Sequence, residues 1–273
     1  MKKIIIIVIS LFSQVSLSQV SYVLTENIKY KSDSFYKNDY QKERCVLDTY
    51  IPVGVSDFPT LVYFHGGGLK GGDKIIPENL KGNEIAVIAV NYRFFPQVST
   101  SVVIDDAAAA VAWTFNHIEE LGGSKDKIFL SGHSAGGYLT SMLGLDKHFL
   151  NNYNIDADQI AGLIPLSGHT ITHMTVREES GIGPLTPLVD KWAPLHHIRA
   201  DAPPYIIITG DRELEMLGRY EENAYMWRMM QLIKHKKTEI YELQGYGHMM
   251  VYPAIPLVVR KVKEITKSID SRN

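Results

Sequence analysis

A serine between glycines is the strongest candidate for chemistry in this chain. Residues 131–137 read Ser-Gly-His-Ser-Ala-Gly-Gly, directly after a short apolar run, and contain the pattern Gly-x-Ser-x-Gly centred on Ser134. Small residues two places before and after the serine let a tight strand-to-helix turn close without collisions. Such a turn lifts the hydroxyl above a sheet. Ser134 is therefore predicted to be a nucleophile, in preference to an ordinary helix N-cap.

A glycine-rich segment could serve the same reaction. His65, Gly66, Gly67 and Gly68 follow another apolar run. Glycines let a loop turn its N–H groups toward one point, and the oxyanion of an acyl-transfer intermediate needs donors fixed in place before the reaction. We expect the N–H groups of Gly67, Gly68 and Ala135 to form this oxyanion hole. A phosphate-binding loop is disfavoured because the lysine and hydroxyl pattern of nucleotide loops is missing.

The elements that must position these residues alternate along the chain. Short runs rich in β-branched residues alternate with helical patterns from residue 44 onward, which is typical of crossover units and a mostly parallel sheet. Several runs are apolar on both faces, as expected where helices cover both sides. Strands are predicted at residues 44–51, 60–65, 85–91, 127–131, 160–166, 205–209 and 239–243, and helices at 105–121, 135–145 and 219–235. The fold class is therefore α/β.

The motifs and their order resemble a known family. The segments His65 to Gly68, Asn91 to Pro96, Asp105 to Ala107 and Gly132 to Gly137 are similar to those of hormone-sensitive-lipase-like esterases, which include bacterial carbohydrate acetyl and feruloyl esterases. The resemblance covers residues 44–268. It implies an α/β-hydrolase fold, a Ser-acid-His triad and no cofactor. Relatives often place Trp or Phe just after the glycines, where this chain has Leu69, so Leu69 is expected to affect the shape of the acyl pocket.

The other two triad members should follow the serine, the acid after one late strand and the histidine after the next. His248 lies in the segment Gly-Tyr-Gly-His, whose glycines let a side chain project from a loop, and it is the predicted base. The family usually places its acid three residues beyond the glycine that follows the earlier strand, which falls on Glu213. Asp211 remains an alternative, because either carboxylate could orient an imidazole.

The regular alternation fails between residues 168 and 202. This proline-containing segment is interpreted as an insertion over the sheet edge, and such segments tend to be lids or binding loops. His169 is expected to line the substrate cleft, with a satisfied surface histidine as the alternative. His169 and His173 have the spacing of two ligands on one helical turn, but the glutamate of His-Glu-x-x-His is missing and the residues between them are poor helix formers. No metal site is predicted.

The first residues have the pattern of a secretory signal. Lys2 and Lys3 precede a short apolar run, and Ser16 and Ser18 occupy the small-residue positions before a cleavage point. We expect a signal peptide over residues 1–18, one domain over residues 19–273 and a periplasmic or secreted product without stable membrane insertion. The formal charge of −2 argues against a nucleic acid partner, and the single cysteine, Cys45, excludes an intrachain disulfide.

These patterns predict a serine hydrolase that cleaves carboxylic esters, with short acyl groups on carbohydrates as the expected substrates. Export and the resemblance to secreted esterases are the grounds for carbohydrate. A prolyl-oligopeptidase-like peptidase and a formamidase-type amide hydrolase remain alternatives, because ester and amide hydrolysis use the same catalytic groups. A hydrolase fold that binds without catalysis is the alternative from another class of protein.

Overall fold

The computed structural model describes residues 20–272, in which eight strands form one sheet. The spatial order of the strands is β1-β2-β4-β3-β5-β6-β7-β8. The pairs β1–β2 and β2–β4 are antiparallel, and every other pair is parallel. The strands are β1 (Tyr22–Lys29), β2 (Val46–Pro52), β3 (Phe58–Phe64), β4 (Ala86–Val90), β5 (Gly123–His133), β6 (Gly162–Leu166), β7 (Tyr205–Gly210) and β8 (Thr238–Leu243).

The prediction of a mostly parallel sheet is confirmed, with β2 to β8 at the seven predicted places. The first strand, β1, was not predicted. It lies at the edge of the sheet next to β2, and most of its side chains are exposed. Such a strand carries little of the apolar signal that identifies a buried one.

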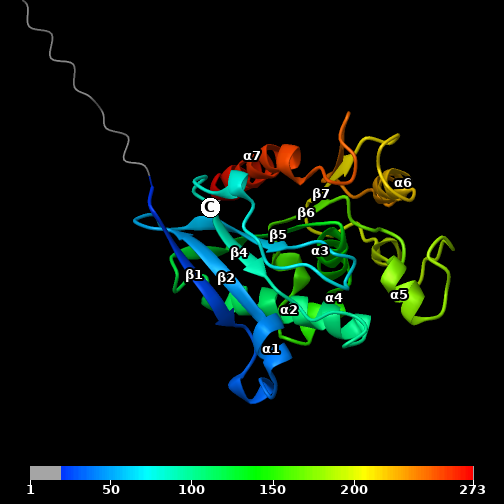
Figure 1. The fold of residues 1–273 in the computed structure, drawn as a ribbon. Helices are drawn as coiled ribbons and strands as arrows, with labels where there is room; N and C mark the ends of the chain where they lie inside the picture. Colours follow the sequence, from blue (N-terminus) through cyan, green and yellow to red (C-terminus); the bar gives the residue numbers. More distant parts are fainter. Residues whose placement is uncertain (1–19, 273) are drawn as a thin grey trace, which may run out of the picture.

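Helices cover both faces of the sheet, as predicted (Figure 1). Side chains of α2, α3 and α6 join one buried apolar cluster, and α7 joins the cluster on the opposite face. The helices are α1 (Asp39–Arg44), α2 (Thr100–His117), α3 (Ala135–Leu145), α4 (Lys147–Asn151), α5 (Met174–Glu179), α6 (Arg219–Leu232) and α7 (Val251–Asp270). The motifs predicted to carry the chemistry lie in the loops that follow β3, β5, β7 and β8, which are parallel strands and so end at the same edge of the sheet.

Two helices differ from the sequence expectation. Helix α2 begins at Thr100, so Asp105 and Asp106 lie in its second turn, not at its start. Asp106 is fully buried there and pairs with cations from other segments. Helix α7 was not predicted. It contains Pro256, which argues against a helix by local rules, but one side of it buries a continuous apolar stripe against the sheet.

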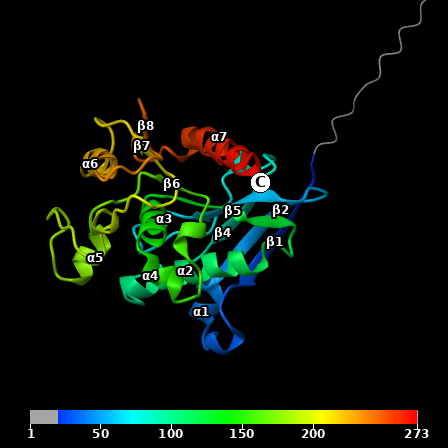
Figure 2. The ribbon, with the colours of Figure 1, turned by 180° about the vertical axis from the view of Figure 1, so that it is seen from behind.

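The irregular segment 168–202 contains the short helix α5 and a 3₁₀ turn at Pro194–His197. Figures 1 and 2 show α5 at the side of the molecule, beyond α3. The predicted signal peptide, residues 1–18, lies outside the described residues. Within residues 20–272, no helix is both long enough and apolar enough to cross a membrane.

Candidate active site

Ser134 lies at the sharp turn between β5 and α3. Its backbone has φ 55° and ψ −112°, a conformation that side-chain-bearing residues seldom adopt. The turn is compact because a Cβ on Gly132 would lie 2.6 Å from the Phe64 carbonyl oxygen, and one on Gly136 would lie 2.1 Å from the same atom. The glycines of the motif are therefore required for this turn to pack against β3. The serine hydroxyl is left at the carboxyl edge of the sheet.

His248 lies in the loop between β8 and α7 and reaches the serine. Its Nε2 is 2.9 Å from Oγ of Ser134. The other ring nitrogen, Nδ1, is 2.6 Å from Oε1 of Glu215. The structure thus brings Ser134 and His248 together as expected and adds a carboxylate behind the imidazole.

Glu215, which the sequence analysis missed, is the acid at this position. Oε2 of its carboxylate accepts hydrogen bonds from the Ser167 hydroxyl and from the Gly210 N–H, and Oε1 accepts one from the Met216 N–H at 3.0 Å. Burial acts to raise the pKa of the Glu215 carboxyl, but the hydrogen bonds from His248, Ser167 and Met216 outweigh burial and lower that pKa to about 2. The carboxylate is therefore ionised at neutral pH and holds the imidazole in one orientation.

The prediction of Glu213 as the acid is wrong, and so is its alternative, Asp211. Glu213 is exposed, and its N–H bonds the carboxylate of Asp211. Asp211 instead supports the histidine loop, since its Oδ2 accepts the Gly245 N–H at 2.7 Å. The carbonyl of Asp211 accepts the N–H groups of Leu214 and Glu215. The chain therefore makes a full turn between Asp211 and Glu215, and the Glu215 carboxylate then faces His248. In the sequence, the only sign of the orienting acid was that this loop contains several acidic residues.

The glycine loop after β3 lies beside the serine. A Cβ on Gly66 would be 3.5 Å from Cβ of Ser134. Gly67 has φ +116°, and a Cβ on it would lie 2.0 Å from the Gly71 carbonyl oxygen, so the loop requires glycine there. Among residues 20–272, the N–H groups of Gly67 and Gly68 make no hydrogen bond. Ala135 is the first residue of α3, where a helical N–H has no partner in its own helix. These N–H groups are free to bind an oxyanion.

Comparison with known proteins identifies the family. A family model described as BD-FAE matches residues 47–216. The chain belongs to the BD-FAE family. It is thereby a member of the hormone-sensitive-lipase-like group of α/β-hydrolases, and the predicted fold is confirmed.

Curated relatives of this BD-FAE chain match over part of their length. A probable isoprenylcysteine alpha-carbonyl methylesterase of Arabidopsis thaliana is 34% identical over 100 residues, which are 35% of this chain and 21% of the relative. Carboxylesterase NlhH of Mycobacterium tuberculosis is 34% identical over 97 residues, which are 34% of this chain and 30% of the relative. The chain thus spans about a fifth to a third of the length of these relatives.

Solved structures resemble the BD-FAE chain along nearly its whole length. A truncated carbohydrate esterase from gut microbiota has a TM-score of 0.71 at 16% identity, covering 92% of this chain and 99% of the other. Esterase 2 of Thermogutta terrifontis has a TM-score of 0.68 at 22% identity, covering 95% and 98%. At these identities the likeness establishes the fold.

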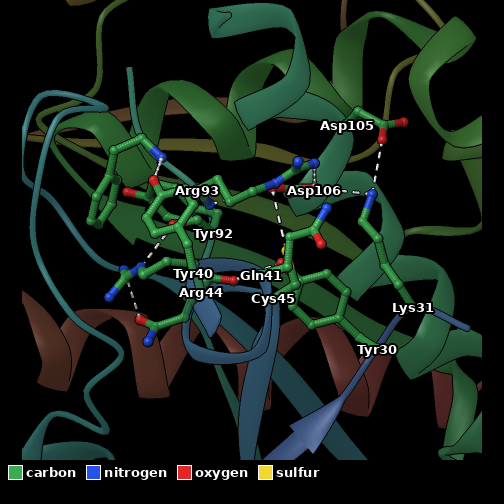
Figure 3. A network of polar contacts seen from close by, with 12 residues as sticks. Tyr30, Lys31, Tyr40, Gln41, Arg44, Cys45, Tyr92, Arg93, Asp105 and Asp106 are labelled. Atoms are coloured by element: carbon green, nitrogen blue, oxygen red, sulfur yellow. Dashed lines mark hydrogen bonds and ion pairs between the residues drawn. The ribbon is translucent and has the colours of Figure 1, made fainter. Parts of the chain in front are cut away.

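Arg44, at the end of α1, supports the glycine loop from behind and lies within the network of Figure 3. Its guanidinium is nearly fully buried and donates to the Gly72 carbonyl, the Asn91 side chain and the Tyr92 carbonyl, each at 3.2 Å. Arg44 also lies 3.4 Å from Nε2 of His65. Burial lowers the pKa of His65 to about 4, and the charge of Arg44 acts in the same direction. A neutral His65 and a charged Arg44 thus pack together under the loop.

A buried ion pair connects β4 to α2. Arg93, in the segment Asn91 to Pro96, donates from Nε and Nη2 to both oxygens of Asp106, at 2.7 and 2.8 Å. Lys31 approaches the same carboxylate at 2.9 Å and also pairs with Asp105 (Figure 3). The arginine and paired acids of the motif therefore have a structural role here, because they join the segment after β4 to helix α2.

The two residues expected to bind substrate are both buried, which contradicts the expectation for them. Leu69 is fully buried in the main apolar core cluster, and its φ is 61°. Nδ1 of His169 donates a hydrogen bond to Oε1 of Glu222, at 2.8 Å. The same glutamate accepts the N–H groups of Thr170 and Ile171, and it pairs with Arg219. Burial lowers the pKa of His169. His169 thus helps to fasten the insertion to α6.

Nothing in the described part of the chain gathers three or more His, Cys, Asp or Glu side chains as a metal site would. His173 lies beside His169, with ring centroids 4.8 Å apart, but its Nδ1 accepts the Thr175 N–H. The neighbouring Thr175 hydroxyl donates to the Gly68 carbonyl at 2.5 Å. The insertion therefore contacts the glycine loop directly.

Proposed function

We propose that this protein is a serine hydrolase that cleaves carboxylic esters, with Ser134 as nucleophile, His248 as base and Glu215 as the orienting acid. The observation that carries the proposal is the continuous hydrogen-bonded chain from the Ser134 hydroxyl through the imidazole to the Glu215 carboxylate. The matched relatives named as a methylesterase and a carboxylesterase support ester chemistry.

The first half of the reaction forms an acyl-enzyme. Oγ of Ser134 attacks the ester carbonyl carbon while Nε2 of His248 takes the hydroxyl proton. The negative charge that develops on the carbonyl oxygen is bound by the N–H groups of Gly67, Gly68 and Ala135. When the tetrahedral intermediate collapses, the bond to the alkoxy oxygen breaks and His248 gives its proton to the leaving alcohol.

The second half regenerates the enzyme. His248 removes a proton from a water molecule, whose oxygen attacks the acyl carbon and forms a second tetrahedral intermediate. The bond to Oγ of Ser134 then breaks, the serine regains a proton from the imidazole, and the carboxylic acid leaves. Glu215 remains ionised throughout and stabilises the imidazolium that forms in each half.

The proposal extends to short acyl groups, such as acetyl, on carbohydrates. The structural neighbour described as a carbohydrate esterase from gut microbiota supports this substrate class. We also propose that the protein acts in the periplasm or outside the cell, because residues 1–18 have the pattern of a signal peptide. Sequencing the N-terminus of the mature protein tests this part: cleavage after Ser18 is expected, and an intact Met1 in the exported fraction contradicts it.

The activity is tested with a fluorophosphonate probe and a substrate panel. Covalent labelling of the wild-type protein and its loss in Ser134→Ala are expected, and a folded but unlabelled wild-type protein would favour a non-catalytic binding role. Acetylated xylan, feruloylated oligosaccharides and simple acyl esters are then compared. Faster turnover of a peptide anilide than of p-nitrophenyl acetate would favour the peptidase or amidase alternatives.

A further inference from the structure

A cavity of about 420 Å³ lies beside the catalytic residues and has no part in the chemistry described above. Gly66 and His133 line its inner end. Its outer wall is formed by two segments: the loop that contains Ile75, and the segment with Met249, just before α7, and Tyr252, in its first turn. These residues, Gly66, His133, Ile75, Met249 and Tyr252, together define what we call the α7 groove.

The inner end of the α7 groove adjoins the catalytic residues. A Cβ on Gly66 would lie 3.5 Å from Cβ of Ser134 and 3.2 Å from Nδ1 of His133. The ring of His133 packs against that of His248 with centroids 4.8 Å apart, and its Nε2 donates to the His248 carbonyl at 2.7 Å. Ser134 and His248 do not themselves line the cavity, so its inner end lies one residue away from them, at Gly66 beside Ser134 and at the His133 ring beside His248.

The outer wall exposes three large apolar side chains around one hollow. Ile75 is 58% exposed, Met249 is 81% exposed and Tyr252 is 74% exposed. Single exposed apolar side chains are ordinary, but several that surround one concave site mark a place where a ligand covers them. Glu78 and Asn79 also line the groove and add hydrogen-bonding groups to it.

The position of the groove decides which half of an ester it would hold. During acyl transfer the leaving oxygen receives its proton from Nε2 of His248, so the alcohol must lie on the imidazole side of Ser134. Met249 and Tyr252 follow His248 in the chain, and the ring of His133 contacts the ring of His248. The groove is thus on the side of the leaving alcohol.

We propose that the α7 groove binds the alcohol portion of the ester and selects alcohols that carry a ring with an apolar face. This inference rests on the proposed ester hydrolysis and adds the specificity of its leaving group. The ring packs against Tyr252 and Met249, because aromatic and thioether side chains make favourable contacts with flat apolar surfaces. A pyranose and an aryl group both present such an apolar ring face. Glu78 and Asn79 would bind the hydroxyls of a pyranose.

The test compares kcat/KM for three acetyl esters that differ in their alcohol: phenyl acetate, an acetylated methyl xyloside and ethyl acetate, which has no ring. Tyr252→Ala and Met249→Ala are expected to lower the ratio of a ring ester to ethyl acetate by about tenfold, the scale of one lost apolar contact. Tyr225→Ala, which removes another exposed tyrosine on the outer side of α6, is the matched control and keeps the wild-type ratios.

The possible results distinguish aryl alcohols from sugars, and they test the groove proposal separately from the proposed ester hydrolysis. A fall for phenyl acetate alone assigns the groove to aryl alcohols, and a fall for the xyloside alone assigns it to sugars. Unchanged ratios for both rings overturn the groove proposal while ester hydrolysis stands. A changed preference between phenyl acetate and phenyl butyrate, without a change in alcohol ratio, also overturns it, because the groove would then hold the acyl chain. A wild-type protein that cleaves none of these esters refutes the proposed function itself. Thermal melting of both variants verifies that they are folded.

Discussion

Nδ1 of His248 lies 2.6 Å from Oε1 of Glu215, across 33 positions of sequence. Two other carboxylates, Asp211 and Glu213, are in the same loop and do not contact the imidazole. The choice among them follows from the turn at Asp211, whose carbonyl accepts the N–H groups of both Leu214 and Glu215. This relationship has direct consequences for activity.

Glu215→Gln should lower kcat by about 10³-fold to 10⁴-fold, because an amide cannot stabilise the imidazolium or maintain its orientation. Glu213→Gln is the matched control, since that side chain is exposed, and it should keep kcat near the wild-type value. Initial rates on phenyl acetate measure both variants. A crippled Glu213→Gln beside an active Glu215→Gln would mean that the loop rearranges when substrate binds.

The pH dependence of the protein's stability should reflect the hydrogen bonds that stabilise the Glu215 carboxylate. The pKa of Glu215 is lowered from the ordinary 4.5 to about 2 in the folded protein, so this carboxylate stabilises the fold fully above pH 4.5. That contribution is lost as the pH falls through about 2. Urea unfolding of wild type and Glu215→Gln between pH 2 and 6 measures it. The difference between their unfolding free energies should shrink toward low pH, and a constant difference would show that the carboxylate is not specially stabilised.

Gly67→Ala should lower kcat by about 10²-fold to 10³-fold, the cost of losing one oxyanion donor. The added methyl would lie 2.0 Å from the Gly71 carbonyl oxygen at a φ of +116°, so the loop must move. Gly71→Ala is the matched control, because nothing lies within 4 Å of the corresponding position. Steady-state kinetics with thermal melting distinguishes a displaced loop from a general loss of fold. Equal rates in the two variants would exclude Gly67 from the oxyanion hole.

Arg44→Met should reduce kcat by about 10-fold to 100-fold with a smaller change in KM, because the glycine loop loses its support and its donors shift. Arg44→Lys keeps the charge but not the fork of donors that joins Gly72, Asn91 and Tyr92, so it should restore only part of the rate. Kinetics on the folded fraction measures both. If the melting temperature falls while kcat is retained, Arg44 serves stability alone.

Asp106→Asn should lower the free energy of unfolding by about 3 to 5 kcal/mol, because Arg93 would keep a desolvated charge without its partner. Asp39→Asn removes one side of the exposed pair with Lys42 and should cost less than about 1 kcal/mol. Chemical denaturation of the two variants gives both values. Equal costs would mean that water reaches the Asp106 carboxylate.

The apolar runs, the two glycine motifs and His248 could all be read from the chain, because each depends on residues close in sequence. A buried parallel strand needs consecutive apolar residues, and the elbow at Ser134 needs glycines two places away on both sides. These local requirements determined seven of the strands and two members of the proposed triad. The prolines in α7 and the exposed face of β1 conflicted with the same local rules, and both elements were missed.

Only the tertiary structure decided which side chains meet. Glu215 faces His248 because a turn rotates it inward, Leu69 packs into the apolar core, and a glutamate from α6 holds His169. Arg44 supports the glycine loop from a helix that is distant from it in sequence. A side chain's direction and its partner depend on packing between segments far apart in the chain, and the pattern of nearby residues carries no record of that packing.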